Sequence, residues 1–148
     1  MALVTSGQII GGSDGKTYAL GRISLRMLAD SEESEGAFAL GEFAGGEGPW
    51  TVPHIHRQSE ESFYVLAGTF TFTLGDTETE ADTGSFILVP RGTRHVLSAG
   101  RGGGRLLTLW TPGGLEAMFK ALSEMPTDSL RDPEIRKALS TRFDSVPV

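Results

Sequence analysis

Short alternating segments separated by glycine dominate this sequence and limit what it can fold into. Strand side chains point alternately to two faces, so an apolar residue at every second position marks a half-buried strand. Residues 22–28 and 69–74 follow this pattern, and residues 62–67 mark a further strand on the other side of Gly68. With 20 glycines and 7 prolines among 148 residues, turns are frequent enough for many short strands. The sequence therefore predicts an all-β sandwich or barrel.

Further strands are indicated on both sides of these segments. Apolar residues within 38–43 mark one strand, and residues 77–80 follow a turn predicted at Gly75. Residues 85–89 and 106–110 are nearly continuous apolar runs, each followed by a proline within two residues. Runs of this kind are typical of strands buried on both faces, so we expect both to be buried.

The pattern changes to helical spacing after residue 111. The apolar set is Leu115, Met118, Phe119 and Leu122, with Glu116 and Lys120 expected on the outside. This stripe is interpreted either as core packing against the sheet or as a lid over a pocket mouth. A second short helix is predicted at 132–139, with Asp132 as its N-cap and Pro133 in its first turn.

Length and charge narrow the possible organisation and partners. A chain of 15.8 kDa fits one domain, so we predict a single domain at 1–148, with a barrel core at about 15–111 and a helical C-terminal extension at about 112–148. The net charge of −6 without a Lys/Arg cluster excludes a phosphate-binding footprint, so no nucleic acid is expected. No apolar window of membrane-spanning length exists, and no membrane partner is expected.

Cysteine is absent from the chain, and residues 1–5 form neither a basic leader nor a long apolar stretch. A cytoplasmic location is therefore the expectation. Without thiolates, any bound metal must be held by nitrogen and oxygen atoms.

The three histidines of the chain fall in two stretches that suggest a metal site. His54 and His56 stand two positions apart on an extended segment, so their imidazoles point to the same side. His95 follows a strand that ends at Pro90 and a turn at Gly92. Imidazole is the commonest neutral ligand of zinc, copper, iron and nickel.

A carboxylate completes this set of candidate ligands. Glu61 has the same strand parity as Phe63 and Val65, so it faces the interior if they do. A buried carboxylate is unfavourable unless it is paired or bound to a cation. Glu60 has the opposite parity and is expected to be exposed.

The two stretches resemble the two motifs of the cupin family. The first has the form G-x5-H-x-H-x4-E-x6-G, from Gly48 through His54, His56 and Glu61 to Gly68. The second has the form G-x5-P-x-G-x2-H, from Gly84 through Pro90 and Gly92 to His95. The family's second motif continues to an asparagine, which is not a ligand, and Ala99 stands at that position here. This departure leaves the expected metal site intact.

The resemblance implies a fold and a metal. The expected fold is an all-β jelly-roll barrel of two antiparallel sheets with one or two short C-terminal helices, often assembled as a homodimer. One divalent transition metal, whether Fe, Ni, Mn, Cu or Zn, would be bound by His54, His56, Glu61 and His95. Relatives whose histidines are merely packed also exist, although here all four ligand positions are filled.

Three functions are compatible with this resemblance. The chain is similar to small quercetinase-like cupins, in which a metal-bound substrate oxygen and dioxygen react and Glu61 would be both ligand and general base. Interior aromatic residues would then suit a small apolar or aromatic substrate such as a flavonol; the candidates are Phe63, Phe70, Phe72, Phe86 and Trp110. The alternatives are a redox-neutral polyketide cyclase or isomerase that uses the metal as a Lewis acid, and a non-catalytic ligand-binding or sensing cupin.

Overall fold

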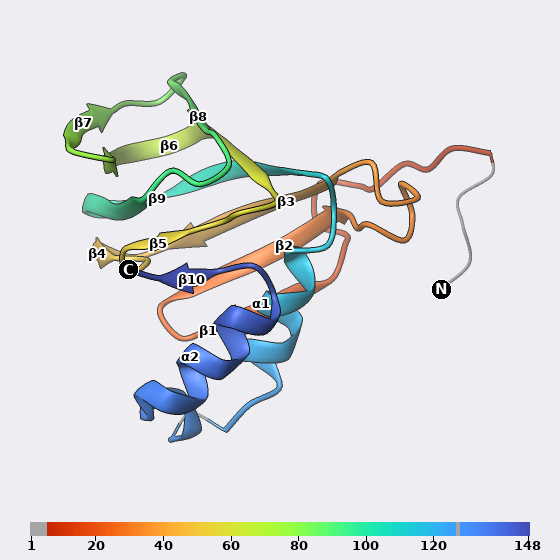
Figure 1. Cartoon of the computed structure of the whole chain (residues 1–148). Helices are drawn as coiled ribbons and strands as arrows, with labels where there is room; N and C mark the ends of the chain where they lie inside the picture. Colours follow the sequence, from red (N-terminus) through yellow and green to blue (C-terminus); the bar gives the residue numbers. More distant parts are fainter. Residues whose placement is uncertain (1–5, 127) are drawn as a thin grey trace.

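The structure is a computed structural model that describes residues 6–126 and 128–148 (Figure 1). Residues 1–5, from which the cytoplasmic location was in part inferred, lie outside the described residues. No helix in the described part of the chain is long and apolar enough to cross a membrane.

Strands are the main regular structure of the described chain. They are β1 (Thr17–Leu20), β2 (Ile23–Ala29), β3 (Ala39–Gly45), β4 (Gly48–Pro49), β5 (His54–Ile55), β6 (Glu60–Leu74), β7 (Thr77–Ala81), β8 (Phe86–Val89), β9 (His95–Thr111) and β10 (Val146–Pro147). The helices are α1 (Glu116–Ser123), the short 3₁₀ helix η1 (Ser129–Arg131) and α2 (Pro133–Arg142). All strand pairs are antiparallel.

The two long strands β6 and β9 organise the sheet. They pair from Glu60 opposite Thr111 to Leu74 opposite His95, and they join the ten described strands into one hydrogen-bonded network. The first half of β6 also pairs with β8. The second half of β9 pairs with β3, which pairs with β2, and β2 pairs with β1. The second half of β6 pairs with β7, and the first half of β9 pairs with β4 and β5. The network therefore has two halves that share β6 and β9. One half contains β1, β2, β3 and β8, and the other contains β4, β5 and β7.

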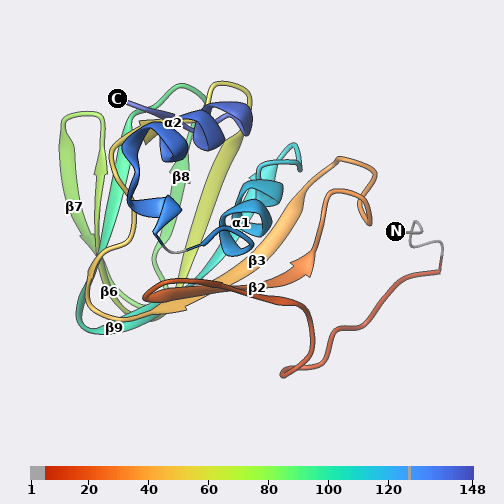
Figure 2. The same ribbon diagram turned by 90° about the horizontal axis from the view of Figure 1, so that it is seen from below.

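A bend separates these two halves. The pairing of β6 with β9 shifts register on both sides of Gly68, whose φ of 83° is in the left-handed region. A Cβ atom at Gly68 would collide with the backbone oxygen of Gly103, so only glycine permits this close approach. The bend curves the network, as Figure 2 shows, and the predicted all-β fold is confirmed.

The core lies between the halves and follows the predicted alternation in most strands. Leu25, Val65, Phe70 and Trp110 are fully buried there. The run at 85–89 is the exception, because Phe86 and Leu88 are 64% and 49% exposed. The expectation that this strand is buried on both faces, with Phe86 inside, was wrong. Among the described residues β8 pairs with β6 alone, so it is an edge strand with an open outer face.

The C-terminal segment forms the predicted helices and then returns to the sheet. The Asp132 carboxylate caps α2 by accepting the N–H of Glu134 at 2.9 Å, and the helix continues past the predicted end to Arg142. After α2, β10 pairs with β5, so the extension is not purely helical. Figure 2 shows α1 and α2 on the open side of the curved sheet.

Glu116 was expected on the outside of α1 but is buried. Its carboxylate accepts the N–H of Ser31 at 2.7 Å and that of Gly114 at 2.6 Å. The carboxylate thus satisfies the N–H of Gly114 just before the helix and connects the loop after β2 to the start of α1.

Candidate metal centre

Three strand starts bring the four predicted site residues together. His54 begins β5 and lies directly opposite His95, which begins β9. His56 follows β5, and Glu61 is the second residue of β6. One potential ligand atom from each residue lies within 4.8 Å of the others. The four side chains are buried, with exposures from 0% to 7%.

Strand parity explains which glutamate enters the site. Glu61 points inward together with Phe63 and Val65, as the alternation predicted. Glu60 points outward and forms an ion pair with Arg91 at 3.4 Å. The site thus receives one carboxylate from β6.

Backbone carbonyls fix the orientation of all three imidazole rings. The Nδ1 atoms of His54, His56 and His95 lie 2.6, 2.8 and 2.9 Å from the carbonyl oxygens of Val52, Asp144 and Thr93, respectively. A carbonyl can only accept, so each Nδ1 carries the hydrogen and donates it. When the ring is neutral, its Nε2 presents a lone pair, which is the form that binds a metal.

Two of these Nε2 atoms lie close to one oxygen of Glu61. Glu61 Oε1 lies 3.2 Å from His95 Nε2 and 3.5 Å from His56 Nε2. His56 Nε2 is buried without a hydrogen-bond partner among the described residues. Lone pairs and a carboxylate that face one another in a buried site repel unless a proton or a metal cation lies between them. The donor set of three nitrogens and one oxygen therefore fits a divalent transition metal.

Burial and mutual charge shift the pKa values of this cluster. Burial, together with the neighbouring His95, lowers the pKa of His54 to about 4. Burial also works to lower the pKa of His56, but the Glu61 carboxylate and the Asp144 carbonyl outweigh it and raise this pKa. Burial works to raise the pKa of Glu61, but His56 and His95 outweigh it and lower this pKa below its usual range. His54 and Glu61 are thus in their metal-binding forms at neutral pH.

Two residues that support the ligands were not identified as site residues from the sequence. The Trp110 indole donates its Nε1–H to Glu61 Oε2 at 2.6 Å, because the two residues lie opposite each other on β9 and β6. Asp144 supplies the carbonyl that orients His56, and its carboxylate accepts the N–H groups of Arg57 and Gln58 at 2.8 and 2.9 Å. Trp110 was expected inside from its strand pattern, whereas no local pattern links Asp144 to His56.

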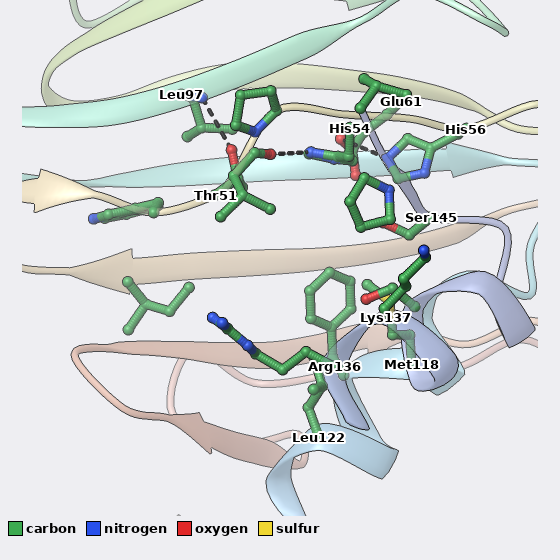
Figure 3. Close-up of a pocket in the computed structure, with 18 of the residues that line it drawn as sticks. Thr51, His54, His56, Glu61, Leu97, Met118, Leu122, Arg136, Lys137 and Ser145 are labelled. Atoms are coloured by element: carbon green, nitrogen blue, oxygen red, sulfur yellow. Dashed lines mark hydrogen bonds and ion pairs between the residues drawn. The ribbon is translucent and has the colours of Figure 1, made fainter. Parts of the chain in front are cut away.

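A pocket of about 590 Å³ opens beside this cluster. His54, His56 and Glu61 line one side of it, and Figure 3 shows α2 opposite, with Arg136 and Lys137 projecting from the helix. The wall between them is mostly apolar and aromatic; it includes Ile23, Phe43, Trp50, Phe63, Leu97, Leu106, Met118, Phe119 and Leu122. Met118 and Phe119 both pack on the core and line this pocket, so the two interpretations of the helical stripe are compatible.

Comparison with known proteins agrees with the fold and the two motifs. A family model described as a cupin domain matches residues 39–111. This chain belongs to the cupin superfamily. The matched region of this cupin contains all four residues of the cluster.

One curated relative of this cupin is an oxygenase. Quercetin 2,3-dioxygenase of Bacillus subtilis (strain 168) is 27% identical over 99 residues, which cover 67% of this chain. The chain spans 29% of that relative's length, so the likeness concerns one part of that protein.

Solved structures confirm the predicted cupin fold, and they include proteins with different names. KdgF from a Halomonas species has a TM-score of 0.65 at 18% identity, covering 72% of this chain and 94% of its own. An RmlC-like cupin from Shewanella frigidimarina NCIMB 400 has a TM-score of 0.62 at 21% identity, covering 73% and 93%. The nucleoside dehydratase Pac13, from Streptomyces, has a TM-score of 0.60 at 15% identity, covering 72% and 83%. At these identities the likeness shows the fold alone.

Proposed function

We propose that this cupin is a metal-dependent dioxygenase that acts on a small aromatic or phenolic substrate such as a flavonol. The observation that carries the proposal is the convergence of three imidazoles and the Glu61 carboxylate beside a largely apolar pocket. The pocket volume is within the range of small-molecule sites. The partial likeness to quercetin 2,3-dioxygenase supports the choice of reaction class.

The metal would be held by Nε2 of His54, His56 and His95 and by Oε1 of Glu61. A divalent transition metal bound there supplies Lewis-acid chemistry to a substrate oxygen and, where it is redox-active, electron transfer as well. Four protein ligands leave room for a substrate atom on a metal that prefers five or six ligands.

Glu61 is also the proposed general base. It lines the pocket, so its carboxylate can reach a hydroxyl hydrogen of a bound phenol. The hydrogen bond from Trp110 holds Oε2 and leaves Oε1 directed to the site. The aromatic wall would orient the flat ring of the substrate and exclude water from it.

Oxygen uptake with metal-reconstituted protein tests this proposal. Elemental analysis of the purified protein comes first, followed by reconstitution with each candidate metal and uptake assays with quercetin and substituted catechols. We expect uptake with at least one redox-active metal and none for His95→Ala. Turnover of a polyketone without oxygen would instead support a redox-neutral cyclase or isomerase, and binding without turnover would support a ligand-binding cupin.

Glu61→Gln separates the role of ligand from that of base. The amide oxygen can still coordinate a metal, but it cannot accept a proton. We expect kcat to fall about 10²- to 10⁴-fold, as for loss of a general base, while metal is retained. Full activity of this variant would remove the base role from Glu61.

A further inference from the structure

The pocket has two chemically different ends. At one end lie the imidazoles of His54 and His56 with the Glu61 carboxylate. At the other end Arg136 and Lys137 of α2 belong to the lining, together with the one carboxylate of this helix, Glu134. Figure 3 shows the Arg136 and Lys137 side chains on the side of α2 that faces the histidines. A ligand that fills the pocket therefore meets the metal-binding cluster and a pair of cations.

The wall between these two ends favours an apolar body. Phe43 and Phe119 pack edge to face with ring centroids 5.2 Å apart, and Phe63, Leu106 and Met118 complete this stretch. A flat aromatic body can be buried there, whereas a charged group in this part of the pocket would lose its hydration without a partner. An anionic group of the ligand is thus best placed at the α2 end.

Charge is unusually distributed on α2. The chain carries a net charge of −6, yet α2 has three cations, Arg136, Lys137 and Arg142, and one carboxylate, Glu134. In the part of the chain that the structure describes, neither Arg136 nor Lys137 has an ion-pair partner. This local positive charge attracts anions in an otherwise acidic protein.

The acidic residues that flank α2 are already engaged. The Asp132 carboxylate accepts the N–H of Glu134 at the start of the helix. The Asp144 carboxylate, just after the helix, accepts the N–H groups of Arg57 and Gln58. Both carboxylates are thus hydrogen-bonded to backbone N–H groups and do not pair with Arg136 or Lys137, which remain available to a ligand.

We propose that the pocket binds an aromatic compound that carries an anionic group, such as a carboxylate, at the end remote from its metal-facing oxygen. Arg136 and Lys137 bind this anion, and the aromatic wall holds the ring. The position of the metal-facing oxygen rests on the proposed function, whereas the preference for an anion rests on α2. The substrate class is then an aromatic acid with a phenolic oxygen rather than a neutral phenol.

Binding of a matched ligand pair to the zinc-loaded protein tests this inference. The probes are 6-hydroxy-2-naphthoate and its methyl ester, which differ in charge at the end remote from the hydroxyl group. In calorimetric titrations we expect the acid to bind about fivefold to tenfold more tightly than the ester, the size that two solvent-accessible ion pairs provide. The preference should shrink at high ionic strength because salt screens exposed charges.

Charge-removing variants show whether α2 is responsible. The double variant Arg136→Gln, Lys137→Gln should bind the acid as weakly as the ester and leave the affinity for the ester unchanged. The matched control Lys120→Gln, Arg131→Gln removes the same charge from residues outside the pocket lining and should keep the full preference. Equal binding of acid and ester by the unmodified protein would overturn the inference, and so would equal loss of preference in the control.

Zinc separates this test from the proposed function. Binding to the zinc-loaded protein requires no oxygen chemistry, so it is measured whether or not the protein is an oxygenase. A preference for the acid that depends on α2, found together with no oxygen uptake with any metal, would support the inference and contradict the proposed function. Oxygen uptake, found together with equal binding of acid and ester, would support the proposed function and contradict the inference.

Discussion

At the scale of single residues, proton competition at His56 sets the pH dependence of metal binding. The pKa of His56 is raised in the metal-free protein, so a proton must leave before Nε2 can bind a metal. His54, with a pKa of about 4, and Glu61, with a lowered pKa, are already deprotonated near neutral pH. Metal affinity should therefore rise with pH until the raised pKa of His56 is passed, and then level off.

Chelator competition for Co²⁺ between about pH 5 and 8 measures this dependence. We expect the logarithm of the affinity to rise with pH below the pKa of His56, because metal binding releases the proton of its ring. An affinity that does not change with pH in this range would contradict the raised pKa of His56.

Asp144 offers a second prediction at this scale. Asp144→Gly keeps the backbone carbonyl and the left-handed φ of 61°, but it removes the carboxylate that anchors the loop at Arg57 and Gln58. The carbonyl that orients His56 is then held less firmly. We expect metal affinity to fall about 10- to 100-fold, as for other residues that orient ligands.

Asp132→Ala is the matched control for Asp144. It removes another carboxylate that caps a backbone N–H in the same segment, but it does not touch His56. This variant should lose about 1 kcal/mol of stability and keep its metal affinity in the same chelator competition. An unchanged affinity in Asp144→Gly would show that the loop does not control the ring of His56.

At the scale of elements, the bend in β6 depends on Gly68. In Gly68→Ala the new Cβ would collide with Gly103, and the positive φ would add strain. We expect a loss of about 3 kcal/mol or more in the free energy of unfolding by urea. Gly75→Ala also has a positive φ, but nothing lies within 4 Å of its Cβ, so about 1 kcal/mol is expected. Equal losses would show that the contact with Gly103 is unimportant.

Strands were predictable from the sequence where apolar residues alternate clearly with polar residues. The alternation in β6 placed Glu61 inside and Glu60 outside, and Asp132 marked the start of α2. The continuous apolar run of β8 contains no alternation, so its exposed face at Phe86 could not be read from it. Asp144 contacts the loop at His56 from 88 residues away, and local patterns do not report such tertiary contacts.

At the scale of the whole molecule, the homodimer expected from the family resemblance stays a prediction. Tyr64 and Phe86 lie opposite each other on β6 and the edge strand β8, and both are exposed, as is Leu88 nearby. We expect this apolar face to pair with a second copy of the chain. Light scattering should then show a dimer, and a monomer for Phe86→Ser. Ile9→Ser, which removes an exposed apolar side chain elsewhere, should remain dimeric.

The placement of the two tryptophans has a practical consequence. Trp110 is hydrogen-bonded to Glu61, and Trp50 lines the pocket, and these are the two tryptophans of the chain. Ultraviolet emission of the intact protein therefore originates next to the metal centre and next to the ligand. Co²⁺ or Cu²⁺ should quench this emission while Zn²⁺ leaves most of it, and Trp50→Phe would isolate the signal of Trp110. The protein thus carries its own optical probe, which needs no attached label, for metal loading and for pocket occupancy.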